Sequence, residues 1–533
     1  MGEAAASRSA GGTPQGEGAR PSRTVTVIAA AWAGRALAAA RELVLAATLG
    51  TSAAKDALVL AWTLPGLLAA LAGESLTPLL VPRVVADSAA RWRLRQLLRT
   101  AVGRALLAAL VGLALGLAWA APACIHLLAP AASAPTRELA VRLTHLLAVN
   151  TVLLVALAGL GALCQAHGRL AVVPLATGAS ALAVVVALWR ATGSPARQVQ
   201  AAAWGLSLGN ALAVLLLIAV VLRAEERPKA AAHHTWSPAR GSDGLRTSAA
   251  LLLLGTLILH AVPLADRRAG AALGDGAIAA YDYAGRLLQF LFNLGVAPFT
   301  WSRFSRWSRL LAEGAPRHVL ARQVETDLQV LLSGVAPVCV FLALFALPVA
   351  GCVYARGHLA ASGAVAIARA VRVLALGLGA DALLYYALFV FHAHKDAAPR
   401  LLAAALVGVS NAALDFTWAP RWGVAGLAAA HDVAFVLGAA LLLSRLHARL
   451  GLDLRRVARG GLAAAALATL GGGLARVGVQ AWFGVAPGSG MAGQGSLRLL
   501  AALLVVLALY GGALRLLRPR TVALWAAALG EAA

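Results

Sequence analysis

Charged side chains interrupt several long apolar stretches of this sequence, and these residue types could bind an ion or an anionic group there. Arg35, Arg41 and Glu42 lie within one apolar stretch near the start of the chain, and Arg286 lies within another. Within a membrane, an ionisable group at mid-depth costs at least about 2.5 kcal/mol, so it usually faces a cavity or a partner. The other ionisable residues in such stretches are Glu74, Asp266, Asp381, Asp415, His431 and Asp432.

Two of these arginines occupy matching positions. Arg41 and Arg286 each lie about nine residues from the predicted outer end of their stretch, which is a depth of about 13 Å in a helix. Two guanidinium groups at one depth could hold a phosphate group through paired hydrogen bonds. Alternatively, each arginine reaches the membrane surface or pairs with a nearby acid, such as Glu42 or Glu74. Because arginines at mid-depth cannot all reach the surface, the set favours an anion site.

A second group of polar residues contains hard oxygen donors. Asn411 and Asp415 are four residues apart, so both side chains project from the same face of a helix. Oxygen atoms brought together in this way suit a small cation. Spacing alone favours the other possibility, hydrogen bonding between helices.

The composition indicates what must hold these residues in place. Of 533 residues, 60% are hydrophobic and 13% are charged, whereas soluble domains contain about 25% charged residues. This difference excludes an ordinary soluble enzyme. A net charge of +24 would suggest nucleic-acid binding in a soluble protein, but here the arginines separate apolar stretches too long for a globular core. The sequence therefore predicts an all-α polytopic membrane protein with no nucleic-acid partner.

The four cysteines predict neither a metal centre nor a disulfide. No C-x-x-C pair and no zinc-ligand spacing is present, so free thiols are expected. The polar tail of residues 1–23 lacks the apolar stretch of a cleavable signal peptide, and the first apolar stretch is expected to act as an uncleaved anchor.

Apolar stretches of about 20 residues, the length that crosses a bilayer, define the predicted spans. They are fourteen: 24–49, 57–82, 99–121, 139–163, 170–190, 199–222, 248–266, 277–302, 328–352, 363–391, 399–419, 423–444, 457–483 and 497–517. Loops after even-numbered spans are rich in arginine, and the others hold few basic residues. By the positive-inside rule, both termini are therefore predicted to be cytoplasmic.

A weak internal repeat suggests how the spans are grouped. Residues 46–53 and 270–277 are similar and lie six spans apart, which is typical of transporters built from two halves around a central cavity. The predicted parts are a cytoplasmic tail (1–23), an N-terminal lobe (24–222), a cytoplasmic linker (223–247), a C-terminal lobe (248–446) and two further spans with a tail (447–533).

Several ordered motifs resemble the MurJ (MviN) family of lipid II flippases, within the multidrug/oligosaccharidyl-lipid/polysaccharide exporter superfamily. The resemblance covers nearly the whole chain. The motifs are Gly34-Arg35, Ala40-Arg41-Glu42, Leu49-Gly50, Lys55-Asp56-Ala57, Leu64-Pro65, Asp266-Arg267, Tyr283-Ala284-Gly285-Arg286-Leu287 and Gly423 to Ala428.

This resemblance implies a transporter rather than an enzyme. It would flip undecaprenyl-diphosphate-linked peptidoglycan precursor from the inner to the outer leaflet of the bacterial cytoplasmic membrane by alternating access. Carried over by position, the substrate-binding residues are Arg35, Arg41, Arg286, Asp56 and Glu74. The resemblance further implies a possible sodium site, whose residues are Asp266, Asn411 and Asp415.

The chain also departs from the family pattern. Ala69-Ala70 replaces a frequent basic pair, Gly66 replaces an asparagine and Gly285 an aspartate. His431 stands where a sodium-site threonine is expected. Because histidine is bulkier and titrates near neutrality, we hypothesise a cation-responsive site at which coupling to protons is slightly favoured and coupling to sodium stays open. No other cofactor is expected.

Other functions remain open at the level of sequence. The same architecture could carry another polyprenyl-diphosphate-linked oligosaccharide, such as an O-antigen precursor, or export drugs. A membrane glycosyltransferase is less favoured, because the predicted outer loops are short and poor in acids and histidines. A flippase-derived scaffold that no longer transports is a further alternative. Expected partners are the lipid-linked precursor, the bilayer and cell-wall synthesis proteins.

Overall fold

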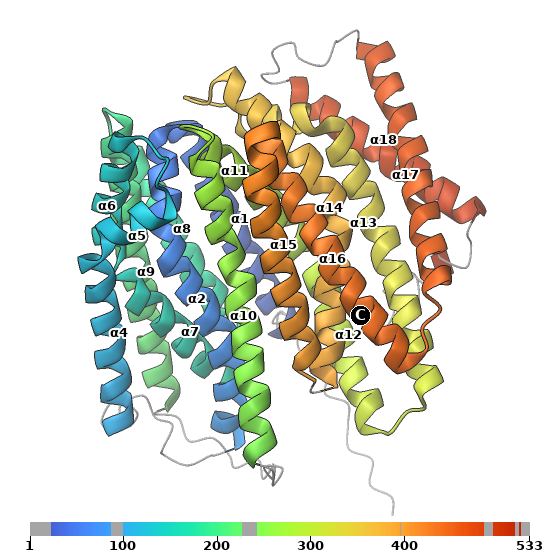
Figure 1. Cartoon of the computed structure of the whole chain (residues 1–533), viewed down its shortest axis with the longest axis horizontal. Coiled ribbons are helices and arrows are strands. Elements are labelled where there is room, and N and C mark those ends of the chain that lie inside the picture. Colours follow the sequence, from blue (N-terminus) through green and yellow to red (C-terminus); the bar gives the residue numbers. More distant parts are fainter. Residues whose placement is uncertain are drawn as a thin grey trace, which may run out of the picture.

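The computed structural model of the chain is a bundle of α-helices (Figure 1). It describes residues 23–86, 100–225, 242–394, 396–483, 494–517 and 522–523, and these ranges contain no strand. The predicted tail (1–23) and linker (223–247) lie largely outside the described residues. The all-helical class expected from the apolar stretches is confirmed.

The helices follow one another along the chain with short connections. The first group is α1 (Arg23–Leu49), α2 (Ala53–Ala86), α4 (Ala101–Trp119), α5 (Ala121–Leu128), α6 (Ala134–Leu147), α7 (Asn150–Ala166), α8 (Val172–Arg190) and α9 (Pro195–Glu225). The second is α10 (Ser242–Ala271), α11 (Ala277–Leu294), α12 (Val296–Ala312), α13 (Arg317–Tyr354), α14 (Ala361–Ala393), α15 (Ala398–Trp422) and α16 (Val424–Leu450). The last helices are α17 (Leu454–Phe483) and α18 (Gln494–Leu517).

Each predicted span coincides with one of these helices or with a broken pair. Among the described residues, nine helices are long and apolar enough to cross a membrane, and up to eleven spans result if each bent pair counts as one. The bent pairs are α4 with α5, at 67°, and α6 with α7, at 45°. The three remaining predicted spans are α1, α10 and α11 with α12, which carry most of the buried charges described below. The number of fourteen spans stays a prediction.

Helix packing divides the molecule into neighbouring groups. In the first group, α1 packs on α8, α2 on α7 and α8 on α9; in the second, α10 packs on α15, and α14 packs on both α13 and α16. We call these groups the N-terminal lobe (α1 to α9) and the C-terminal lobe (α10 to α16). The lobes meet where α10 and α11 contact α2 and α1. Helix α17 packs against α13, and α18 against α17, at the right of Figure 1.

The orientation of the chain in the membrane gives a first testable prediction. Single cysteines at Ser133 and Glu313, both exposed in the structure, lie on opposite sides of the membrane if the arginine-rich loops are cytoplasmic. In intact cells, an impermeant thiol reagent should label the cysteine at Ser133 and spare the one at Glu313. The four native cysteines, all free thiols, would first be replaced by serine.

Glu313 is preferred to the adjacent Gly314 because that glycine has a φ of +70°, which strains any other residue. Labelling of both sites after the cells are permeabilised is the control. If intact cells show labelling of Glu313→Cys but not of Ser133→Cys, the chain has the opposite orientation in the membrane.

Candidate functional site

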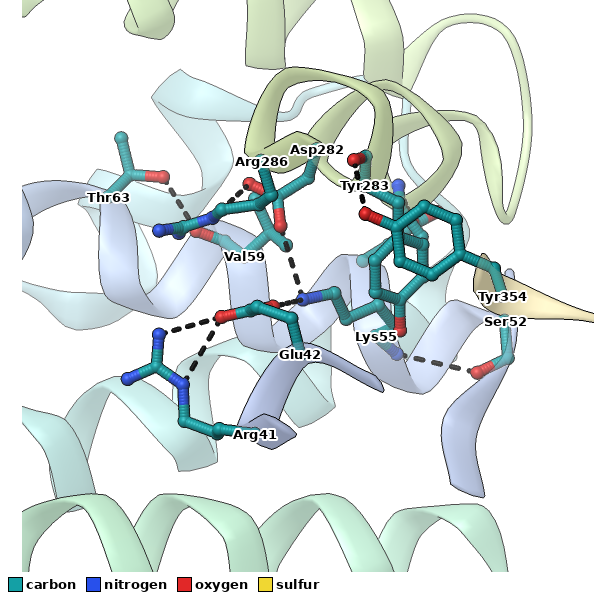
Figure 2. Close-up of polar contacts among 12 residues, drawn as sticks. Arg41, Glu42, Ser52, Lys55, Val59, Thr63, Asp282, Tyr283, Arg286 and Tyr354 are labelled. Carbon is teal, nitrogen blue, oxygen red and sulfur yellow. Dashed lines mark hydrogen bonds and ion pairs between the residues drawn. The ribbon is translucent and has the colours of Figure 1, made fainter. Parts of the chain in front are cut away.

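Six charged side chains converge where α1 and α2 meet α10 and α11. Figure 2 labels the five that α1, α2 and α11 supply. We call them the lobe-interface cluster, and its members are Arg41, Glu42, Lys55, Arg267, Asp282 and Arg286. Four are basic and two are acidic, so the cluster has a formal charge of +2. Because the two lobes supply three residues each, the cluster forms only when the lobes are in contact.

Lys55 lies at the centre of the cluster. Its Nζ is 3.1 Å from an oxygen of Asp282 and 3.8 Å from an oxygen of Glu42, and it lies 4.6 Å from the centre of the Tyr283 ring. Only 4% of the side chain is exposed. A buried ammonium group is stable only with such partners, so Lys55 joins the lobes electrostatically.

Asp282 interacts with three basic side chains. Besides the Lys55 ammonium group, its carboxylate lies 3.5 Å from a nitrogen of Arg267 and 3.6 Å from Nε of Arg286. Arg286 is four residues further along α11, so the two side chains share a helix face. The Asp282 side chain is 4% exposed, and its charge is therefore offset entirely by neighbouring groups.

Arg41 pairs with the acid next to it in the chain. Its Nη2 and Nε donate to one Glu42 oxygen at 2.7 and 3.2 Å. The local pairing considered from the sequence is thus present for this arginine. Its side chain nevertheless remains 22% exposed, so part of the guanidinium group can reach a ligand.

Arg286 is the most accessible member of the cluster. Its side chain is 42% exposed, and the ion pair through Nε is its one polar contact with the part of the chain that the structure describes. It lies nine residues into α11, and Arg41 lies eight residues before the end of α1, which places both about 12 to 14 Å from those helix ends. In Figure 2 both side chains extend to the same side of Glu42 and Asp282. Both arginines therefore belong to the side of the cluster that a ligand would approach.

The other predicted substrate-binding residues lie elsewhere. Arg35 is partly buried on α1 and has no contact with the cluster among the described residues. Glu74 belongs to α2, but its side chain lies outside the described residues. The structure therefore brings Arg41 and Arg286 together without these two.

Asp56 makes contacts that the sequence did not predict. Its two carboxylate oxygens accept hydrogen bonds from the backbone N–H groups of Gly276, at 2.5 Å, and Ala279, at 2.6 Å. It is 2% exposed. These N–H groups form the start of α11, which otherwise lacks a side-chain cap. Because both oxygens are occupied and buried, we interpret Asp56 as a helix cap between the lobes rather than a substrate ligand.

Further contacts join the lobes at this same end of the molecule. Asp275 accepts hydrogen bonds from Ser133 Oγ at 3.1 Å and Thr136 Oγ1 at 2.9 Å. A backbone hydrogen bond of 2.8 Å runs from His358 N–H to the Ala47 carbonyl oxygen. We call the Asp56, Asp275 and His358 contacts the lobe-closing contacts. They close the end at which α1 passes into α2.

Gly276 is required for this closure. Its φ is +90°, a conformation that glycine adopts without a steric penalty. A Cβ atom added here would also be too close to the Thr51 carbonyl oxygen, at 2.5 Å. The α10–α11 connection can therefore approach the α1–α2 turn only with glycine at this position.

The structure brings the predicted cation-site residues together. Asn411 Nδ2 donates to an oxygen of Asp266 and to an oxygen of Asp415, both at 2.8 Å. All three side chains are buried, and the second Asp415 oxygen and Asn411 Oδ1 have no hydrogen-bond partner among the described residues. No group of three or more His, Cys, Asp or Glu in the described residues could hold a metal ion. The chemistry present is two carboxylates bridged by one amide.

His431 does not join these three residues through any contact in the described structure. Its Nε2 lies 3.6 Å from an oxygen of Asp381, and its ring stacks on Phe435 with 4.0 Å between the ring centres. The hypothesis that His431 fills a ligand position therefore lacks the expected contact. The histidine instead pairs with an acid on α14.

Sequence reasoning did not identify Lys55, Arg267 and Asp282 as site residues. Lys55 is one of three lysines among 46 basic residues, which could have marked it as unusual. Asp282 precedes Arg286 by one helical turn, so the spacing pointed to an ion pair.

The chain is similar to a known family and to solved structures. The sequence model of the family described as lipid II flippase MurJ matches residues 45–528. Comparison with curated protein sequences gives no significant match. A structure of the lipid II flippase MurJ in an inward closed conformation is similar, with a TM-score of 0.71 and 17% identity, over 92% of this chain and 99% of that one.

Two other solved structures share the fold. An inward-facing multidrug resistance MATE family transporter of the MOP superfamily has a TM-score of 0.57 and 16% identity, over 80% of this chain and 98% of that one. A MOP superfamily transporter from Pyrococcus furiosus has a TM-score of 0.54 and 14% identity, over 80% and 95% of the two chains. At these identities, the likeness concerns the fold alone.

Proposed function

Because the chain belongs to the MurJ lipid II flippase family, we propose that it moves undecaprenyl-diphosphate-linked peptidoglycan precursor from the inner to the outer leaflet of the bacterial cytoplasmic membrane. It is a multi-pass membrane transporter for a lipid-linked precursor, not an enzyme. The observation that supports a diphosphate-linked cargo is the positively charged lobe-interface cluster, whose most exposed member is Arg286.

The positive charge of the cluster is complementary to the negative charge of the diphosphate in this substrate. A diphosphate bearing sugars cannot enter hydrocarbon unaided, because its charges and hydroxyl groups lose their hydration. The excess positive charge of the cluster would be offset by the diphosphate. Guanidinium groups bind phosphate oxygens through paired, charge-assisted hydrogen bonds, and Arg41 and Arg286 extend toward the same side.

The lobe-closing contacts support a mechanism of alternating access. We propose that the closed end faces outward and that the precursor enters from the inner leaflet. The Asp56 cap and the hydrogen bonds to Asp275 would then break when the lobes separate at the outer end. Because these contacts are few and polar, water can replace them when the outer end opens.

Depletion of the protein tests the proposed cargo. The inner leaflet should accumulate the lipid-linked peptidoglycan precursor, measured by chromatography and mass spectrometry of extracted lipids. Accumulation of a different polyprenyl-diphosphate oligosaccharide would identify a flippase with another cargo. If no lipid-linked precursor accumulates, the proposed transport function is wrong.

The Asp266–Asn411–Asp415 group is proposed as the cation-responsive site. Two buried carboxylates repel each other unless a cation or a proton neutralises one of them. An amide nitrogen of Asn411 lies between the two acids, an arrangement that favours a proton over sodium, because sodium binds oxygen atoms. We therefore expect transport to be coupled to the inward movement of protons rather than of sodium ions.

Transport in proteoliposomes under separate proton and sodium gradients tests this site. A proton gradient should accelerate transport by the wild type, and Asp415→Asn should make transport independent of the gradient. Ser410→Ala, a partly buried neighbour on the same helix, is the control and should behave as the wild type. Acceleration by a sodium gradient alone would mean that the site binds sodium rather than a proton. If neither gradient affects the wild type, the three residues serve only in packing between helices.

A further inference from the structure

The surroundings of Asp282 resemble those of a bound anion. Three basic side chains, Lys55, Arg267 and Arg286, lie within 3.6 Å of its carboxylate. Two of these cations come from the C-terminal lobe and one from the N-terminal lobe, so the carboxylate lies at the lobe interface. An anionic ligand that reached Arg286 would meet a guanidinium group already paired with an internal acid.

We propose that Asp282 is an internal competitor of the diphosphate group, which takes over Arg286 when it binds. The proposal rests on the proposed function, because it concerns the same diphosphate. In the ligand-free protein, Asp282 partly neutralises Arg286. When the diphosphate binds, Asp282 keeps Lys55 and Arg267 as partners.

The geometry identifies Arg286 as the partner that changes. Its contact with Asp282 is the longest of the three, at 3.6 Å, and involves Nε alone. Its side chain is 42% exposed, whereas those of Arg267 and Lys55 are 13% and 4% exposed. A ligand can therefore reach the terminal nitrogens of Arg286 without first disrupting the buried pair of Lys55 and Asp282.

The exchange does not leave a buried charge without a partner. After Arg286 turns to the ligand, Asp282 still has the Lys55 ammonium group at 3.1 Å and the Arg267 guanidinium group at 3.5 Å. Unpaired buried charges are strongly destabilising, so this reserve of partners makes the release of Arg286 feasible. The strength of the remaining pairs then sets how easily a ligand displaces the carboxylate.

The cluster also affects selectivity. A ligand with two phosphate groups can contact Arg286 and Arg41 together, since both point to the same side of the cluster (Figure 2). A monophosphate replaces only the single carboxylate contact. Because displacing the Asp282 contact costs the same free energy for both ligands, the preference for a diphosphate comes from its second contact, with Arg41.

Binding of farnesyl diphosphate to the detergent-solubilised full chain, measured by calorimetry, tests the proposal. Asp282→Asn removes the charge but keeps the shape of the side chain, and it should bind this probe about fivefold more tightly than the wild type. Asp396→Asn removes an equal charge from a partly exposed ion pair with Arg449 and should bind as the wild type does.

A double variant separates competition from a general change in charge. Lys55→Gln combined with Asp282→Asn removes both charges of the buried pair, leaves the net charge unchanged and avoids an unpaired buried lysine. Competition predicts that this variant still binds farnesyl diphosphate about fivefold more tightly. An effect of net charge predicts wild-type affinity, and this result would overturn the proposal.

The outcomes also distinguish this proposal from the proposed function. If the wild type binds farnesyl diphosphate and neither variant binds it more tightly, Asp282 is not a competitor, although a diphosphate transporter remains. If the wild type fails to bind the probe, the proposed function is contradicted as well. Should Asp282→Asn alone fail to fold, the charge-balanced double variant decides the question.

Discussion

Replacement of Arg286 by alanine is expected to abolish transport while leaving the protein folded and inserted. A charge-assisted hydrogen bond contributes about 1.5 to 3 kcal/mol, so its loss weakens binding by one to two orders of magnitude. The effect on stability should be small, because Arg286 is 42% exposed and contributes one long ion pair. Growth with Arg286→Ala as the sole copy and flipping in proteoliposomes measure the loss.

A departure from the family pattern strengthens this expectation. Ala69 and Ala70 are partly buried on α2 where the family often carries a basic pair, so the cluster has fewer basic groups that could compensate. Arg197→Ala changes an equally charged, exposed residue at the start of α9 and should transport normally. If Arg41→Ala and Arg286→Ala both support normal growth, the proposal that these arginines bind the diphosphate is wrong.

The position of the helices follows from the apolar stretches, but the breaks within them do not. The predicted span 139–163 is the pair α6 and α7, which bends by 45°. No proline or glycine marks this break. Asn150 at the start of α7 bonds to Ser207 and Asn210 on α9, so side chains distant in sequence stabilise the bend.

The site was only partly predictable for a similar reason. Depth along a helix follows from residue counting, and the matching positions of Arg41 and Arg286 are found in the structure. The partners of Asp282 and Lys55 depend on how α2 packs against α11, which one sequence does not specify. The resemblance implies that Asp56 binds substrate because it matches an acid of the family pattern by position, yet its oxygens cap a helix more than 200 residues away.

Replacement of Asp56 by asparagine is expected to open the end of the molecule that the lobe-closing contacts hold shut. The carboxylate accepts hydrogen bonds from two N–H groups with two oxygens, whereas an amide has one oxygen and a nitrogen that donates. One buried N–H of α11 would then lose its acceptor, at a cost of about 1 to 3 kcal/mol. A change of this size moves the equilibrium toward the open form by about fivefold to 150-fold.

Distances between spin labels at Glu138 and Arg356 report this opening, because these positions lie on the two lobes near that end, on α6 and on the connection between α13 and α14. Asp56→Asn should lengthen the mean distance and reduce transport, since the closed form is needed for the cargo to be accepted from the other side. Asp453→Asn is a matched control: this aspartate caps the start of α17 through the Arg456 N–H, away from the lobe interface, and should leave the distance unchanged. An unchanged distance in Asp56→Asn would mean that the remaining contacts, such as those of Asp275 with Ser133 and Thr136, are sufficient to close this end, and that Asp56 does not control access.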